Sequence, residues 1–130
     1  DAKIVYGLHH NTTREIVAAS IEDGTFENYL QKIPVKADDV FLIQSGTIHA
    51  IGAGTLIAEI QQCSDLTYRL YDYNRKDKKG IKRELHIKKA LDVADLRGTL
   101  ELRQPMRVLN YSPGCLDVPL NYLEDANIFK

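Results

Sequence analysis

Residues 38–52 read DDVFLIQSGTIHAIG, and this stretch decides the fold that we expect. An apolar run enters a small-residue turn, Ser45-Gly46, and His49 follows three residues after the glycine. Short apolar runs that are separated by turns of this kind predict β-strands. The stretch therefore predicts two strands joined by a tight turn, with His49 on the second strand.

Further short runs lie on both sides of this stretch. Residues 4–8 predict a strand, and residues 55–62 and 67–73 predict two more, separated by turns that contain Gly or Asp. Strands at such close spacing are typical of an antiparallel sandwich or barrel. We therefore expect a mainly β chain whose central strands extend over about 40–73.

Helical signals are few and short. Thr12 has Glu15 three residues later, which is typical of a helix N-terminus, and the helical spacing ends at a glycine. Residues 25–30 predict a second, shorter helix, so we expect a helical insert over about 12–30. A third short helix is predicted over 87–94.

The composition limits the possible partners. The 17 Lys and Arg residues against 18 Asp and Glu residues give a net charge of -1, so we expect neither nucleic acid nor a membrane as partner. Cys63 and Cys115 are far apart and predict reduced thiols in a cytosolic protein. The basic segment 74–82 predicts an exposed loop.

The pattern predicts two units. We expect residues 1–82 to form a barrel portion, and residues 83–130 to form a linker helix and the truncated start of a second β unit, with strands at 100–102 and 108–111. Both ends fall in apolar, strand-like runs, whereas domain boundaries normally lie in polar or Pro/Gly-rich linkers. We therefore expect a fragment.

Strand parity relates His49 to Glu59 and Gln61. Alternate residues of a strand share a face, so a hairpin with an odd loop at 52–54 would point His49 and Glu59 to one side. A charged Glu59 inside a barrel would need a cation or a hydrogen-bond partner. With a two-residue loop, Glu59 would instead face water, and a single Gly-x-x-His element is more often structural than metal-binding.

Residues 67–73, TYRLYDY, place Arg69 between tyrosines. Such an arginine is commonly a surface cation that stacks on an aromatic ring. It can equally be a fixed positive charge that faces a sugar phosphate or an oxyanion, because a planar guanidinium donates two parallel hydrogen bonds. The pattern leaves both interpretations open.

Taken in order, the segments SGTIHA (45–50), EIQQCSDLTYRLYDY (59–73) and RELHIKKAL (83–91) resemble the short bacterial branch of the type I mannose-6-phosphate isomerases. The Gly-x-x-His element also resembles the second cupin motif. The resemblance covers most of the chain and implies a cupin-like antiparallel β-barrel, or jelly roll, with short helices.

The resemblance also implies a site. His49 would bind zinc, Arg69 would be the active-site arginine, and Glu59 and Gln61 would line the same pocket, with Glu59 a candidate to move the proton. The expected reaction interconverts mannose 6-phosphate and fructose 6-phosphate through an enediol. Because the family's other metal ligands lie upstream of this sequence, we expect the fragment to be inactive and to bind zinc weakly.

The sequence leaves two other functions open. A non-catalytic cupin that binds sugar would need the pocket but no metal, and a cupin-type glucose-6-phosphate isomerase would use a different sugar. For the complete enzyme the resemblance implies a small sugar phosphate as substrate, a monomer, and the cytosol as its location.

Overall fold

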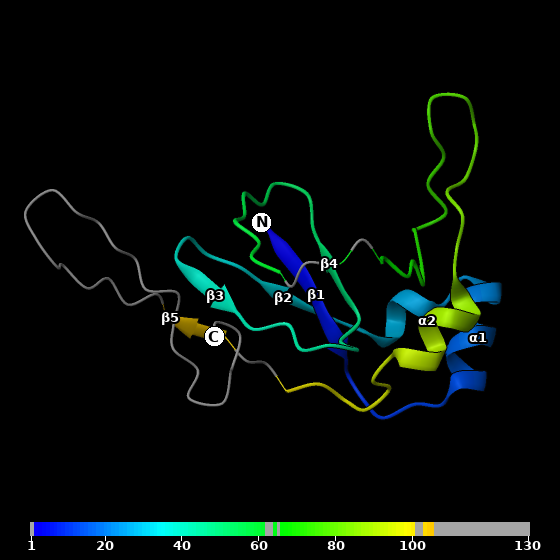
Figure 1. The fold of residues 1–130 in the computed structure, drawn as a ribbon, viewed down its shortest axis with the longest axis horizontal. Helices are drawn as coiled ribbons and strands as arrows, with labels where there is room; N and C mark the ends of the chain where they lie inside the picture. Colours follow the sequence, from blue (N-terminus) through cyan, green and yellow to red (C-terminus); the bar gives the residue numbers. More distant parts are fainter. Residues whose placement is uncertain (1, 62–63, 65, 101–102, 106–130) are drawn as a thin grey trace, which may run out of the picture.

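The computed structural model describes residues 2–61, 64, 66–100 and 103–105. The elements in chain order are β1 (Lys3–Leu8), α1 (Arg14–Asp23), the 3₁₀ helix η1 (Phe26–Tyr29), β2 (Leu30–Pro34), β3 (Asp39–Phe41), β4 (His49–Ile51), α2 (Ile87–Val93) and β5 (Arg103–Pro105). The strands form an antiparallel sheet in the order β2-β1-β4 and a separate antiparallel ribbon of β3 and β5 (Figure 1). Small antiparallel sheets with few, short helices confirm the coarse prediction, but the described strands do not close into a barrel.

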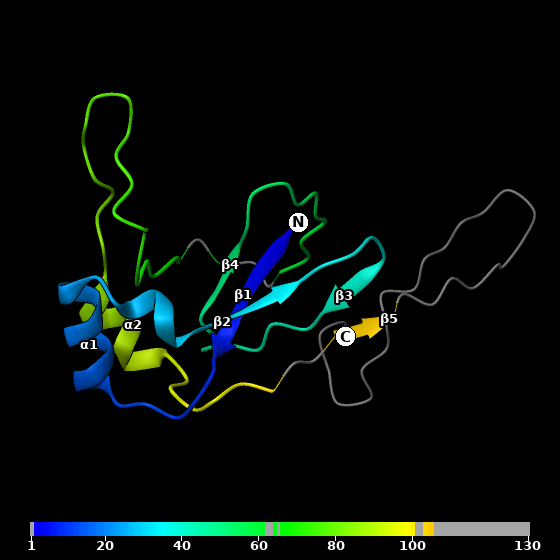
Figure 2. The ribbon, with the colours of Figure 1, turned by 180° about the vertical axis from the view of Figure 1, so that it is seen from behind.

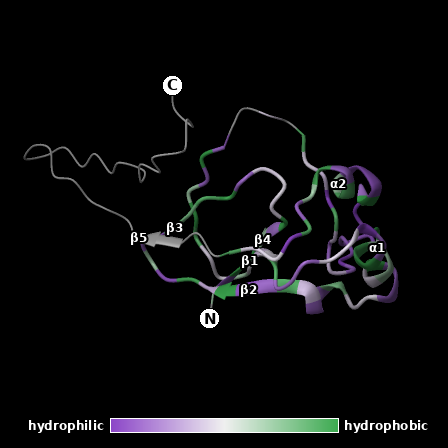
Figure 3. Ribbon diagram, turned by 90° about the horizontal axis from the view of Figure 1, so that it is seen from below, coloured by the Kyte–Doolittle hydropathy of each residue, from purple (hydrophilic) through white to green (hydrophobic). Residues whose placement is uncertain are grey.

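Strand β1 is the centre of the fold because both of its faces are covered. Val5 and Leu8 pack in a core with residues of α1, η1 and α2, whereas Ile4 and Tyr6 pack on the other side with Ile33. The two helices lie side by side at one end of the sheet in both views (Figures 1 and 2). Both helices show hydrophobic and hydrophilic residues in Figure 3, as expected for helices that cover a core on one side.

Helix α1 begins one residue later than the sequence predicts. Its N-cap is Thr13, whose side chain accepts a hydrogen bond from the Ile16 amide, so Thr12 is not the cap. Both threonines have the required hydroxyl, and only the backbone geometry selects between them. The predicted end is confirmed, because Gly24 closes the helix with a left-handed φ of 80°.

The second predicted helix is shorter than expected, and a strand follows it directly. Only Phe26–Tyr29 is helical, as a 3₁₀ turn, and Leu30–Pro34 forms β2. The sequence did not predict this strand because Pro34 is a poor strand residue. Strand β2 lies at the edge of its sheet, and there a proline is tolerated.

Two predicted central strands are wrong for the residues that the structure describes. Residues 55–61 and 67–73 have no strand conformation, and Leu56, Ile57 and Ile60 are exposed. A strand needs a neighbour that pairs with its backbone groups along its length. The described residues supply no such neighbour for 55–61, and for 67–73 they supply only the backbone hydrogen bond from the His86 amide to the Arg69 carbonyl. Leu100 is likewise not in a strand, and the predicted strand at 108–111 lies outside the described residues.

Two further predictions are confirmed. Helix α2 occupies Ile87–Val93, and residues 74–82 form an exposed loop that projects from the body of the molecule (Figure 1). A bridge between Lys76 and Lys82 makes this loop hairpin-like. Among the described residues, no helix has the length and apolar character that a membrane span needs.

Candidate active site

His49 starts β4 and lies directly across from Tyr6 of β1. Directly opposed residues of antiparallel strands point to the same side of the sheet, so the imidazole lies on the face that Ile4 and Tyr6 occupy. His49 Nδ1 is 2.9 Å from the carbonyl oxygen of Thr47. A carbonyl can only accept, so Nδ1 carries the hydrogen and Nε2 of the neutral ring keeps its lone pair. Metal-binding histidines use this same arrangement.

Arg69 is half-buried and held by the segment that precedes α2. Its amide donates to His86 Nδ1 at 3.1 Å, its carbonyl accepts from the His86 amide at 2.7 Å, and its guanidinium Nη1 donates to the Glu84 carbonyl at 3.1 Å. A guanidinium has five N–H groups, which is more than this one bond uses. Arg69 is thus a positioned cation that can still bind an anion.

Glu59 and Gln61 lie on the exposed, irregular segment that was expected to be a strand. The hairpin that would point His49 and Glu59 to one side is therefore absent from the structure, and here the carboxylate of Glu59 faces solvent. The geometric part of the prediction is wrong because its parity argument required a strand pair that the described residues do not form. The roles of both residues remain predictions.

Within the described part of the chain, no hydrogen bond or ion pair joins any two of His49, Glu59, Gln61 and Arg69. The described part of the chain also contains no group of three or more His, Cys, Asp or Glu side chains that could hold a metal. A catalytic zinc takes three protein ligands and a structural zinc takes four. His49 alone therefore does not fit a zinc site, and further ligands would have to come from residues outside the described ones.

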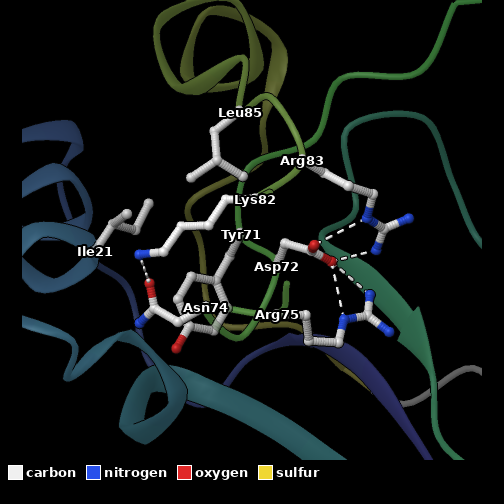
Figure 4. A pocket seen from close by; sticks show the side chains of 8 residues that line it. All are labelled: Ile21, Tyr71, Asp72, Asn74, Arg75, Lys82, Arg83 and Leu85. Atoms are coloured by element: carbon white, nitrogen blue, oxygen red, sulfur yellow. Dashed lines mark hydrogen bonds and ion pairs between the residues drawn. The ribbon is translucent and has the colours of Figure 1, made fainter. Parts of the chain in front are cut away.

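The sequence did not predict an ion cluster in which the buried Asp72 pairs with the exposed Arg75 and Arg83. Asp72 is 5% exposed and accepts hydrogen bonds from Arg83 Nε at 2.8 Å and from Arg75 Nε at 3.1 Å (Figure 4). The Arg83 guanidinium, with help from Arg75, holds the pKa of this carboxyl well below its usual range, although burial acts in the opposite direction. An acidic residue with arginines three and eleven positions later was the available signal.

Two cavities lie near this cluster. The smaller, about 50 Å³, is lined by Asp72, Arg75, Lys82, Arg83 and neighbouring residues (Figure 4), and is too small for a hexose phosphate. The larger, about 270 Å³, has Lys3, Lys32, Tyr73 and Arg75 in its lining. Neither His49 nor Arg69 lines either cavity.

The chain is similar to several known proteins. It is 51% identical over 96 residues to the mannose-6-phosphate isomerase ManA of Bacillus subtilis (strain 168), which is 74% of this chain and 30% of that protein. It is 51% identical over 92 residues to the mannose-6-phosphate isomerase of Streptococcus mutans serotype c, which is 71% of this chain and 29% of that protein. No model of a known protein family matches the chain.

A solved structure is also similar. The crystal structure of a mannose 6-phosphate isomerase from Bacillus subtilis superimposes with a TM-score of 0.69 at 35% sequence identity, over 88% of this chain and 35% of that one. This chain is thus similar in sequence and in fold to part of several sugar-phosphate isomerases. In particular, each of them is a mannose-6-phosphate isomerase, which confirms the resemblance seen in the sequence. The chain spans about 30% of the length of the curated relatives.

Proposed function

We propose that this chain is part of an enzyme that interconverts mannose 6-phosphate and fructose 6-phosphate. The observation that carries the proposal is the 51% identity over 96 residues. A continuous stretch of that length in a chain of 130 residues must include residues 35–96, so the similarity extends over His49, Glu59, Gln61 and Arg69.

The proposed reaction removes a proton from the carbon next to a carbonyl, forms an enediol, and returns the proton to the neighbouring carbon. Negative charge develops on the oxygen in this intermediate, and a positioned cation lowers the barrier most when it is fixed before the reaction begins. The hydrogen bonds to His86 and Glu84 support Arg69 in this role. Glu59 is the candidate to move the proton, and Gln61 is the candidate to bind the sugar.

We propose that zinc binds the whole protein through His49 Nε2 and ligands outside the described residues. The bond from Nδ1 to Thr47 supports this, because it fixes the tautomer that a metal requires. The described residues alone contain no group of His, Cys, Asp or Glu that could hold the metal. The zinc would serve as a Lewis acid for the open sugar.

We also propose that the exposed segment 55–61 packs within a cupin-like barrel, or jelly roll, when the rest of the protein covers it. The exposed apolar side chains of Leu56, Ile57 and Ile60 support a covered position. We further propose that residues 1–82 and 83–130 belong to two different units of the fold. In this proposal the whole enzyme is a cytosolic monomer. The 130-residue chain alone is inactive because it lacks the other metal ligands.

The test is a turnover assay on a protein of the relatives' full length that contains this sequence. We expect it to convert mannose 6-phosphate to fructose 6-phosphate with a kcat/KM at least about 100-fold above that for glucose 6-phosphate, because the two sugars differ in the configuration of the hydroxyl on the reacting carbon and so fit the site differently. Sugar binding without turnover would contradict the proposal and favour a non-catalytic cupin. A preference for glucose 6-phosphate would favour a glucose-6-phosphate isomerase.

A further inference from the structure

Residues 69–72 and 83–86 run side by side as the two arms of a hairpin. At one end, the backbone of Arg69 bonds with His86, and three residues further along each arm Asp72 forms an ion pair with Arg83. The ion pair and the Arg69 bonds thus close the base of the projecting loop at two points. The arm that carries Arg69 therefore contacts the other arm before Leu70, through Arg69, and after it, through Asp72.

His86 completes this pairing with its side chain. Its amide donates to the Arg69 carbonyl, but the return bond from the Arg69 amide goes to His86 Nδ1 and not to a backbone carbonyl. His86 is also the N-cap residue of α2, yet its side chain makes no capping bond there. Because the imidazole is oriented toward Arg69, it fixes that residue and leaves the helix uncapped.

The same bond sets the state of the imidazole. Nδ1 must be unprotonated to accept, so the hydrogen of the neutral ring lies on Nε2. The ring packs edge-on near Tyr68, at 6.5 Å between centroids, and Nε2 is 4.0 Å from a carboxylate oxygen of Glu84. The neighbouring groups therefore hold the ring in an orientation that presents Nδ1 to the Arg69 amide.

We propose that His86 is a positioning residue for Arg69. Its Nδ1 fixes the Arg69 backbone at the point where the Glu84 carbonyl holds the guanidinium, so that the cation is preorganised to face the anionic intermediate. The inference rests on the proposed function for the role of Arg69, but the positioning contact stands on the geometry alone. His86 acts through Arg69 and does not itself touch substrate.

Two variants of the whole protein test this, with turnover as the first measurement. His86→Leu removes the acceptor while it keeps an apolar side chain of similar bulk, and we expect kcat to fall about 10- to 100-fold, the range that follows from a catalytic group displaced by about 1 Å, with KM changed less than about threefold. His86→Asn keeps an acceptor oxygen near the position of Nδ1 and is a favourable helix N-cap, so we expect it to fold and to keep kcat within about threefold of the wild type.

A double-mutant cycle separates positioning from a general loss of structure. In an Arg69→Ala background, His86→Leu should have no further effect on kcat, because the group through which it acts is gone. Additive losses would overturn the proposal. The control is His10→Leu at an exposed histidine, which should leave kcat unchanged.

Hydrogen exchange of the Arg69 amide makes the outcome independent of the proposed function. We expect exchange at this amide to accelerate at least about tenfold in His86→Leu and to stay slow in His86→Asn, as the loss or retention of its acceptor requires. Unchanged exchange in His86→Leu would overturn the positioning contact, and so would a variant that loses kcat while this amide stays protected. If the wild type has no isomerase activity, the proposed function fails, and the exchange experiment still decides whether His86 holds Arg69.

Discussion

At the scale of single residues, Asp72 is a buried carboxylate that pairs with two arginines. Its carboxylate is 5% exposed and accepts hydrogen bonds from two arginines, of which Arg83 lies eleven residues away. The pKa of Asp72 is lowered below its usual range, first by Arg83. A carboxyl whose pKa is depressed on folding stabilises the protein above its unfolded pKa, near 4, and this contribution is lost as the pH falls below that value.

Asp72→Asn should therefore lower the midpoint of thermal unfolding by several degrees at pH 7, because a neutral amide accepts weaker hydrogen bonds from Arg75 and Arg83 than the buried carboxylate does. The difference from the wild type should shrink as the pH falls from about 4 toward 2, where the native carboxyl also begins to lose its charge. Thermal unfolding followed by circular dichroism across this pH range measures both effects.

Asp95→Asn is the matched control for this substitution. Asp95 pairs with Arg97 only two residues away, and their side chains are 38% and 81% exposed. The hydrogen bonds from Arg97 lower the pKa of Asp95 to about 2. Exposed pairs of this kind contribute little to stability. If the two substitutions lowered the thermal midpoint equally at pH 7, the Asp72 cluster would stabilise the protein no more than an exposed ion pair does.

Sequence alone indicated individual residues better than their contacts. His49 was expected on a strand after a small-residue turn, and it starts β4. Arg69 was singled out, but its bonds to His86 were not, because they depend on two segments seventeen residues apart that meet without regular strand pairing. A pattern of residue types contains no information about such a meeting.

At the scale of elements, Gly7 shows how closely β1 is packed. Its φ is 72°, and a Cβ added there would lie 1.9 Å from the Thr99 hydroxyl oxygen. The Thr99 amide donates to the Leu8 carbonyl, so this segment cannot withdraw without the loss of a backbone hydrogen bond. Gly7 thus allows residues 98–99 to lie against the end of the strand.

Gly7→Ala should destabilise the protein by more than about 2 kcal/mol, because it adds a steric clash to a left-handed φ that alone costs about 1–2 kcal/mol. Gly24→Ala is the control, since Gly24 has a φ of 80° with nothing within 4 Å of an added Cβ. Urea unfolding of both variants gives the two free energies. A Gly7 variant no less stable than the Gly24 variant would show that the close approach of Thr99 is unimportant.

The elements that were predicted correctly are those whose signals are local. The periodicity and the closing glycine of α1 lie within one segment, and so does the apolar pattern of β1. Strand β2 was missed because its proline is acceptable only at a sheet edge, which is a property of the assembled sheet. Residues 55–61 show the opposite error, a predicted strand that the structure lacks. Their apolar pattern fits a strand, but the described chain supplies no partner strand for them.

At the scale of the whole molecule, the described residues complete the surroundings of Arg69 but not those of His49. Arg69 has its contacts in place, whereas His49 presents one nitrogen without companion ligands among the described residues. The chain spans about 30% of the length of its curated relatives, so most of a relative-sized protein lies outside it. The described residues can therefore position the cation of the proposed site without completing a metal centre.

The most direct test of this account is steady-state turnover of mannose 6-phosphate by the full-length protein and its Arg69→Ala variant. We predict that the substitution lowers kcat/KM by about 100-fold or more, the usual effect of removing a group that stabilises developing charge, while the thermal midpoint changes by only a few degrees. Arg97→Ala, at an exposed arginine, should leave turnover unchanged. Wild-type turnover in the Arg69→Ala variant would contradict the account.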